Sequence, residues 1–255
     1  MLNALYIAAV GLQAQKEQLD ASANNFANMS TPAYKRQSVD FSGVLGRAAT
    51  QGRLDAVIAP EMLTKHQLRI DMSPGTIEAT GHPLDVAVSG ASFLEVQLPD
   101  GKTGFTRGGS LQVNAAGELA LVANDLPLKS DVRVPSGATG VSVDAGGRVT
   151  GILPGDVERT LLGQLELAVP SNSEYLQYRG DGVFTAADGA PDPLRGRPGD
   201  EGIPTLVAQS LEASNVGLTN EMVSLMLTQR VYELNSRIVQ AVDEMMGLAN
   251  NLRRG

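Results

Sequence analysis

Apolar residues recur every seven positions near the beginning of the chain. Leu5, Leu12, Leu19 and Phe26 stand one heptad apart, and a helix over residues 3–28 would carry them as one narrow stripe. A stripe this narrow is typical of a helix that pairs with other helices, because a helix covering a globular core needs a broader apolar face. The pattern therefore predicts an N-terminal helix that is incomplete without a partner.

A second heptad pattern occupies the end of the chain, where a helix is expected over residues 220–252. Two interleaved series provide the a and d positions of a coiled coil: Leu227, Leu234, Ala241 and Leu248, and Val231, Ile238, Met245 and Leu252. This helix would extend roughly 50 Å at 1.5 Å per residue. Packing of both terminal helices on one central domain is the alternative that the spacing leaves open.

Between the helices the period changes from seven to two. Short segments of alternating apolar residues, such as "SFLEVQLPDGKTGFTR" and "SLQVNAAGELALV", are separated by Gly-containing turns, which is typical of antiparallel hairpins. Turns are expected at Pro99-Asp100-Gly101, Ala116-Gly117 and Gly146-Gly147. The segment 185–202 is rich in Gly, Pro and Asp and is expected to be an exposed, mobile loop.

The expected fold class is α+β, with a central all-β domain of antiparallel hairpins. The expected organisation is an N-terminal helix over 1–30, an extended connecting segment over 31–75, a β-rich domain over 76–205, and a C-terminal linker and helix over 206–255.

Composition narrows the classes of function. A net charge of -8 argues against binding to nucleic acid through a basic surface. The chain has no cysteine and two histidines, His66 and His82, so a thiolate metal site is excluded and a histidine zinc site would need carboxylates as well. No metal or cofactor is expected. No apolar run is long enough to span a membrane, and the first basic residue is Lys16, so a cleaved Sec signal is not expected.

Catalytic patterns are missing from the sequence. The acidic residues near "DGAPDPLRGRPGDEG" lack the spacing of a calcium loop, and no nucleophile elbow, phosphate loop or dinucleotide fingerprint is present. The chain is therefore not expected to be an enzyme. A secreted β-domain enzyme or an adhesin stays as the less favoured alternative, since two catalytic carboxylates could lie anywhere in a sequence.

Both ends of the chain carry recognisable motifs. The segment "ALYIAAVGLQAQKEQLDASANNFANMSTPAYKRQSVDF" resembles the N-terminal signature of the bacterial flagellar rod and hook protein family, and "SLEASNVGLTNEMVSLMLTQRVYELNSRIVQAVDEMM" resembles its C-terminal signature. The matching residues at one end are Asn24, Asn25, Ala27, Asn28, Thr31, Tyr34, Lys35 and Arg36. At the other end they are Leu211, Glu212, Ser214, Asn215, Val216, Gln229, Arg230, Tyr232, Glu233 and Asn235. The central segment "GHPLDVAVSGASFLEVQLPDGKTGFTR" follows the family as well. Within the family, the segments "YKRQSVDF" and "TQRVYELNSRIVQAVDEMM" favour subunits of the distal rod, with proximal rod and hook subunits as the alternative.

This resemblance implies a structural subunit that assembles into a hollow helical shaft, transmits torque to the hook and leaves a channel for export. It implies that the two terminal helices pair as a coiled coil, with Leu5, Leu12, Leu19 and Phe26 against the Leu227 and Val231 series, and that the termini fold on assembly. The implied partners are copies of the same chain, other rod and hook proteins, the surrounding ring proteins and the flagellar export apparatus. The implied location is the basal body, where the rod crosses the periplasm.

The asparagine block has a physical interpretation in this setting. Asn24, Asn25 and Asn28 can satisfy backbone groups that are freed where the helix ends, and Pro32 prevents the helix from continuing. Tyr34, Lys35 and Arg36 would then anchor the connecting segment, although a solvated basic pair is an equally good interpretation.

Overall fold

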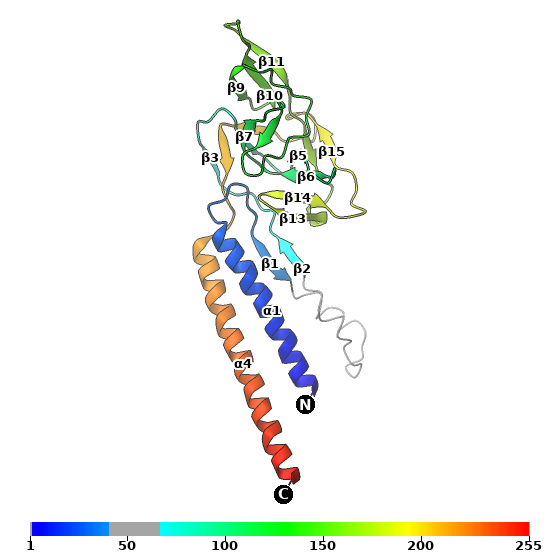
Figure 1. The fold of residues 1–255 in the computed structure, drawn as a ribbon, viewed down its shortest axis with the longest axis vertical. Coiled ribbons are helices and arrows are strands. Elements are labelled where there is room, and N and C mark those ends of the chain that lie inside the picture. Colours follow the sequence, from blue (N-terminus) through cyan, green and yellow to red (C-terminus); the bar gives the residue numbers. More distant parts are fainter. Residues whose placement is uncertain (1, 41–66, 255) are drawn as a thin grey trace. The chain divides into compact units, whose positions relative to one another are not determined.

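The computed structural model describes residues 2–40 and 67–254 and divides the chain into two compact units (Figure 1). The first unit contains Met1–Met29, Arg36–Asp71 and Val216–Gly255, and the second contains Ser30–Lys35 and Met72–Asn215. Each unit is thus assembled from segments that are far apart in the sequence. The predicted segment 31–75 is divided between the two units, and its residues 41–66 lie outside the described part.

The first unit is dominated by two helices, α1 (Leu2–Ala27) and α4 (Leu218–Arg254). They contact each other and run in opposite directions, and α4 extends beyond the beginning of α1 (Figure 1). Both helices were expected from the heptad patterns, and their ends agree with the predicted ones to within two residues. Glu221 stands in the first turn of α4, where a carboxylate is favoured by the helix dipole.

A two-stranded ribbon completes the first unit. It consists of β1 (Gln37–Asp40) and β2 (Gln67–Ile70), which pair antiparallel with Gln37 opposite Ile70. Strand β1 also packs along α1. The chain therefore reverses direction after α1 and returns beside it as a strand.

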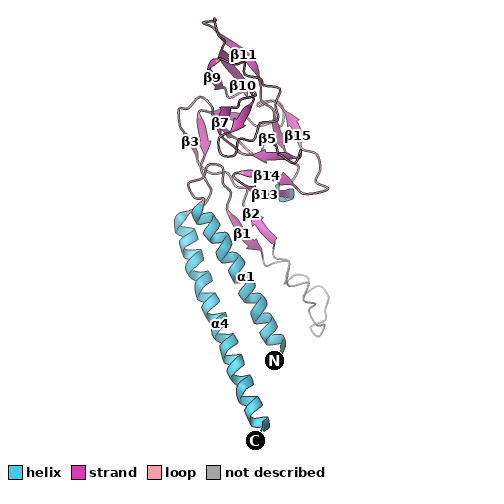
Figure 2. Cartoon of the chain, viewed as in Figure 1, coloured by secondary structure: helices cyan, strands magenta, loops and turns pink. Residues whose placement is uncertain are grey.

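The second unit is built almost entirely from short antiparallel strands (Figure 2). A six-stranded sheet has the order β13-β14-β6-β5-β12-β15, a four-stranded sheet the order β16-β4-β7-β8, a three-stranded sheet the order β11-β10-β9, and β17 pairs with β3. The strands are β3 (Ile77–Ala79), β4 (Asp85–Val88), β5 (Phe93–Gln97), β6 (Thr103–Thr106), β7 (Gly108–Val113), β8 (Leu119–Leu121), β9 (Thr139–Val143), β10 (Arg148–Ile152), β11 (Arg159–Gln164), β12 (Leu167–Val169), β13 (Leu176–Gly180), β14 (Val183–Ala186), β15 (Leu194–Gly196), β16 (Leu206–Ala208) and β17 (Ser210–Glu212). A single turn of 3-10 helix, Ser173–Tyr175, precedes β13.

The hydrophobic core of the second unit lies between its sheets. Val86 and Val88 of β4, Leu94 and Val96 of β5 and Leu119 of β8 are among its buried members. Every residue of β4 and β8 and the first four residues of β5 are buried, so these strands are covered on both faces. The α+β class is confirmed, with mostly antiparallel strands.

The predicted hairpin turns are present. Gly101, Gly117 and Gly147 have φ of 80°, 78° and 74° and lie between β5 and β6, β7 and β8, and β9 and β10 respectively. Glycine adopts this left-handed region at little cost. The turn chemistry of the sequence was therefore a reliable guide to strand pairing.

Two expectations about the central region need correction. The segment 185–202, expected to be a loop throughout, contains β15, which pairs with β12 through Ala168 and Arg195. The compact β unit also extends to Asn215 rather than to 205, because β17 pairs with β3 through Leu211 and Glu78. Strands of three residues are too short to show an alternating pattern in the sequence.

Candidate functional site

The end of α1 binds strand β1 through side-chain amides. Asn25 is fully buried; its Nδ2 donates to the Gln37 carbonyl at 2.7 Å, and its Oδ1 accepts from the Gln37 amide at 2.8 Å. One heptad earlier, Gln18 Oε1 accepts from the Val39 amide at 3.1 Å. These amides replace the neighbouring strand that β1 lacks on this side, so they fix how the chain leaves the helix.

The other asparagines of the block behave differently. Asn28 Nδ2 donates to the Asn24 carbonyl at 2.9 Å, and the Asn28 amide donates to the same oxygen at 3.1 Å. This satisfies a carbonyl at the helix end, as the sequence led us to expect for the block. The role of Asn25 was missed, because it depends on a strand twelve residues further along the chain.

Arg36 joins β1 to the beginning of α4. Its Nε donates to Glu221 Oε1, and the Glu221 side chain is fully buried while that of Arg36 is 31% exposed. Among the described residues, Glu221 Oε2 has no hydrogen-bond partner. An ion pair with one buried member is costly to break, because the remaining charge is left without compensation.

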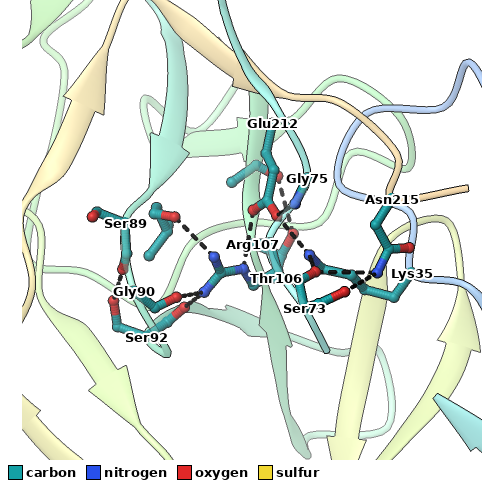
Figure 3. A network of polar contacts seen from close by, with 12 residues as sticks. Lys35, Ser73, Gly75, Ser89, Gly90, Ser92, Thr106, Arg107, Glu212 and Asn215 are labelled. Atoms are coloured by element: carbon teal, nitrogen blue, oxygen red, sulfur yellow. Dashed lines mark hydrogen bonds and ion pairs between the residues drawn. The ribbon is translucent and has the colours of Figure 1, made fainter. Parts of the chain in front are cut away.

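Glu212 is the centre of a buried polar network in the second unit (Figure 3). Its Oε1 accepts from Lys35 Nζ and from the Gly75 amide, and its Oε2 accepts from Arg107 Nε at 3.1 Å. Its carbonyl accepts from the Ala33 amide at 2.7 Å. Three distant segments of the chain are therefore held by one residue.

Both cationic side chains of this network are buried. The side chains of Lys35 and Arg107 are 0% and 3% exposed. Lys35 Nζ also donates to the Ser73 carbonyl, and Arg107 donates to the carbonyls of Val88, Gly90 and Ser92, all within 3.0 Å. Such full hydrogen bonding is what allows charges to be buried.

An aromatic cluster lies beside the network. Tyr34 is 1% exposed, and its ring meets that of Tyr178 edge to face at 5.7 Å between centroids. Tyr178 packs in turn on Phe184, and Arg107 lies over the ring of Phe93 at 5.4 Å. Tyr34 and Lys35 therefore anchor segment 30–35 in the β unit, and Lys35 is not a solvated cation.

The residues of the C-terminal motif are divided between two environments. Asn215 Nδ2 donates to the carbonyl and the hydroxyl of Ser73, both at 3.1 Å. Asn235 is half-buried. Its side-chain amide lies against the backbone of α1 at Gly11, so closely that a Cβ added to this glycine would be 3.6 Å from Asn235 Nδ2. Gln229, Arg230 and Tyr232 are exposed on α4.

The predicted coiled-coil seam is largely uncovered in the single chain. Leu12 and Leu19 are half-buried and Phe26 is 40% exposed. On α4 the seam residues with described side chains, Leu227, Val231, Leu234, Ile238 and Met245, are between 40% and 58% exposed. Leu5, Leu248 and Leu252 lie outside the described side chains. Pairing of α1 with α4 is observed, but coiled-coil packing through these residues stays a prediction.

The described residues hold little that resembles catalytic chemistry. A hollow of about 330 Å³ in the second unit has Arg107 as its one ionisable lining residue, beside Phe93 and Asn172, and the Arg107 guanidinium is already hydrogen-bonded. Within the described ranges there is no group of three metal-ligating side chains and no helix long and apolar enough to cross a membrane.

The two ends of the chain form a helical unit and its middle forms a β unit. The buried polar groups described above bind neighbouring segments of the chain to one another. Such an arrangement is typical of a structural subunit. Family models agree: "Flagella basal body rod protein" matches residues 5–35, "Flagellar hook protein FlgE/F/G D1 domain" matches 87–151, and "Flagellar basal body rod FlgEFG protein C-terminal" matches 207–252.

Curated relatives match over nearly their whole length. The chain is 32% identical to flagellar basal-body rod protein FlgG of Caulobacter vibrioides over 99% of this chain and 100% of that protein. It is 31% identical to FlgG of Agrobacterium fabrum over 98% of each, and 31% identical to flagellar basal-body rod protein FlgF of Escherichia coli over 99% and 98%. The chain belongs to the flagellar basal-body rod protein family. This confirms the predicted family and the expectation of a structural protein that is not an enzyme.

Proposed function

We propose that this chain is the subunit of the distal rod of the bacterial flagellum. The observation that carries the proposal is the end-to-end match to rod proteins named FlgG, such as the 32% identity over 99% of this chain. Rod proteins work as an assembled shaft, so the chain polymerises with copies of itself and contacts other rod and hook proteins. The shaft transmits torque to the hook and leaves a channel for later subunits.

The arrangement of the chain supports this role. A polymer that grows without closing needs a heterologous interface, in which different surfaces of one subunit meet. The helices α1 and α4 supply long exposed surfaces for such contacts. The buried pairs Arg36–Glu221 and Lys35–Glu212 hold segments firmly inside each unit, which suits a part that bears mechanical load.

The finer expectations belong to the same proposal. Export proceeds through the flagellar secretion apparatus, the shaft crosses the periplasm, and ring proteins surround it. The exposed parts of the seam residues, such as Phe26 and Leu234, become covered in the assembled shaft.

A second candidate is the proximal rod. The 31% identity to FlgF over 99% of this chain favours it as the alternative.

The test is deletion of the gene in the bacterium that encodes this chain, followed by electron microscopy of purified basal bodies. A distal subunit predicts basal bodies with a short rod that lacks its outer part and carries no hook. Loss of the whole rod would indicate the proximal subunit, and a complete rod would contradict both assignments. Complementation with the full gene should restore the rod, whereas a gene lacking residues 2–28 should not.

A further inference from the structure

The first and last segments of the β unit meet one another. Strand β16 pairs with β4, and β17 pairs with β3, with Glu212 opposite Ile77. Segment 30–35 joins them, because the Ala33 amide donates to the Glu212 carbonyl at 2.7 Å. The unit is therefore closed by the last residues of its own sequence.

The closing segment passes so near to its neighbour that only a glycine fits there. A Cβ added at Gly75 would lie 1.9 Å from the carbonyl oxygen of Ala213. The Ala213 amide also donates to the Thr76 carbonyl at 2.8 Å, and the Gly75 amide donates to Glu212 Oε1 at 2.8 Å. Direct contacts between two backbones require both segments to be in their final positions.

Charge makes this closure necessary for the interior of the unit. Arg107 follows β6 and reaches two other strands, since its guanidinium donates to the carbonyls of Val88 and Ser92. Its side chain is buried, and the carboxylate that it meets is that of Glu212, at 3.1 Å. The buried side chain of Lys35 meets the same carboxylate (Figure 3). A buried cation without a counter-charge is strongly unfavourable, so the strands around Arg107 cannot close at low free energy before Glu212 is in place.

We propose that Glu212 is the clasp of the β unit, which reaches its folded state only when the segment 206–215 has been added. The order of the sequence gives this requirement a consequence during synthesis. Glu212 follows Arg107 by 105 residues and Lys35 by 177, so both cations are made long before the carboxylate that they share. The β unit therefore stays open until its last strand is available, when little besides α4 remains to be made.

This delay suits the role proposed above but does not depend on it. A subunit that is exported through a channel has to pass it in an extended form, and a β unit that closes late stays extended for longer. The clasp is a property of the single chain, so it is tested on the unassembled protein, separately from the assignment to the rod.

Refolding of the full chain from urea, followed by near-UV circular dichroism of the aromatic cluster, tests the clasp. Glu212→Gln keeps the size of the side chain and removes its charge. We expect it to slow refolding more than tenfold and to change the unfolding rate less than threefold, because an interaction needed before the barrier acts on the folding rate. A variant that refolded at the natural rate and only unfolded faster would overturn the inference.

Glu95→Gln is the matched control. Glu95 is also buried and also meets two cations, Lys129 and Arg195, but these are 51% and 43% exposed. Because both cations keep their contact with water whether or not the carboxylate is present, its loss should slow refolding less than twofold. Equal slowing in the two variants would show that Glu212 has no special part in closure, and would overturn the inference.

A second measurement uses the natural chain and decides the matter even where Glu212→Gln does not refold. Pulsed hydrogen exchange during refolding reports when each amide becomes protected. The Val88 amide donates to the Arg107 carbonyl, and the Ala213 amide donates to the Thr76 carbonyl. We expect both amides to become protected in the same phase. Protection of Val88 in an earlier phase than Ala213 would show that the unit closes around Arg107 without its last segment, which would overturn the inference.

Discussion

Asn25 of α1 and Gln37 of β1 exchange two hydrogen bonds, of 2.7 and 2.8 Å, between one side-chain amide and one backbone residue. The amide supplies a donor and an acceptor in the arrangement that a neighbouring strand would offer. No charged side chain can do this, because a carboxylate only accepts and an ammonium only donates. The pair therefore sets the direction of the chain as it leaves the helix.

Replacement of Asn25 should release this strand. In Asn25→Asp the Gln37 carbonyl loses its donor and meets a buried carboxylate, so we expect a destabilisation of about 2–3 kcal/mol, with Asn25→Ala costing about 1–3 kcal/mol. Hydrogen exchange of the Gln37 and Val39 amides in the assembled protein measures it. Asn24→Ala, at an exposed position, is the control, and unchanged protection in Asn25→Asp would contradict the proposed role.

The sequence predicted the helices and hairpins because their periods of seven and two are local. It also located Asn25, Tyr34 and Lys35 as members of a motif, through resemblance. Their partners could not be predicted: Lys35 meets Glu212 across 177 residues of chain, and only the folded β unit brings them together. The period of a helix likewise gives the residues of an apolar stripe but not the neighbour that will cover it.

Loss of the carboxylate at Glu212 should destabilise the β unit more than any exposed charge change. Glu212→Gln leaves Lys35 and Arg107 buried without their counter-charge, and breaking a buried ion pair costs about 3–5 kcal/mol. Urea unfolding of the full chain checks this. Glu233→Gln, an exposed position on α4, should change the unfolding free energy by less than about 0.5 kcal/mol.

The coupling within this network can be measured directly. A double-mutant cycle of Lys35→Met with Glu212→Gln should be strongly non-additive, because both changes remove the same interaction. Additive effects would mean that the two charges are held by their other partners.

Gly108 should not tolerate a side chain. Its φ is 107°, and a Cβ there would lie 2.2 Å from the Val86 carbonyl oxygen on the paired strand β4. Gly108→Ala must push β4 and β7 apart, so we expect a loss of more than about 3 kcal/mol. Gly101 is the matched control, since its φ is also positive but nothing lies within 4 Å of a Cβ. Gly101→Ala should cost only about 1 kcal/mol, and equal losses in urea unfolding would show that backbone strain, and not the contact with Val86, decides the result.

Ionisation of Tyr178 should weaken the β unit in alkali. Burial raises the pKa of the Tyr178 phenol above its ordinary value of 10.0, so the folded state keeps the proton more tightly than the unfolded state does. The stabilisation is therefore complete below pH 10.0 and is lost as pH rises through the folded pKa.

Because Tyr178 packs on Tyr34, unfolding followed between pH 9 and 12 should show segment 30–35 released together with the sheet. Tyr178→Phe cannot ionise and should flatten this part of the pH profile, although it gives up the bond from the Gly182 amide. A natural chain and a Tyr178→Phe chain with the same alkaline profile would show that another group controls the loss of stability.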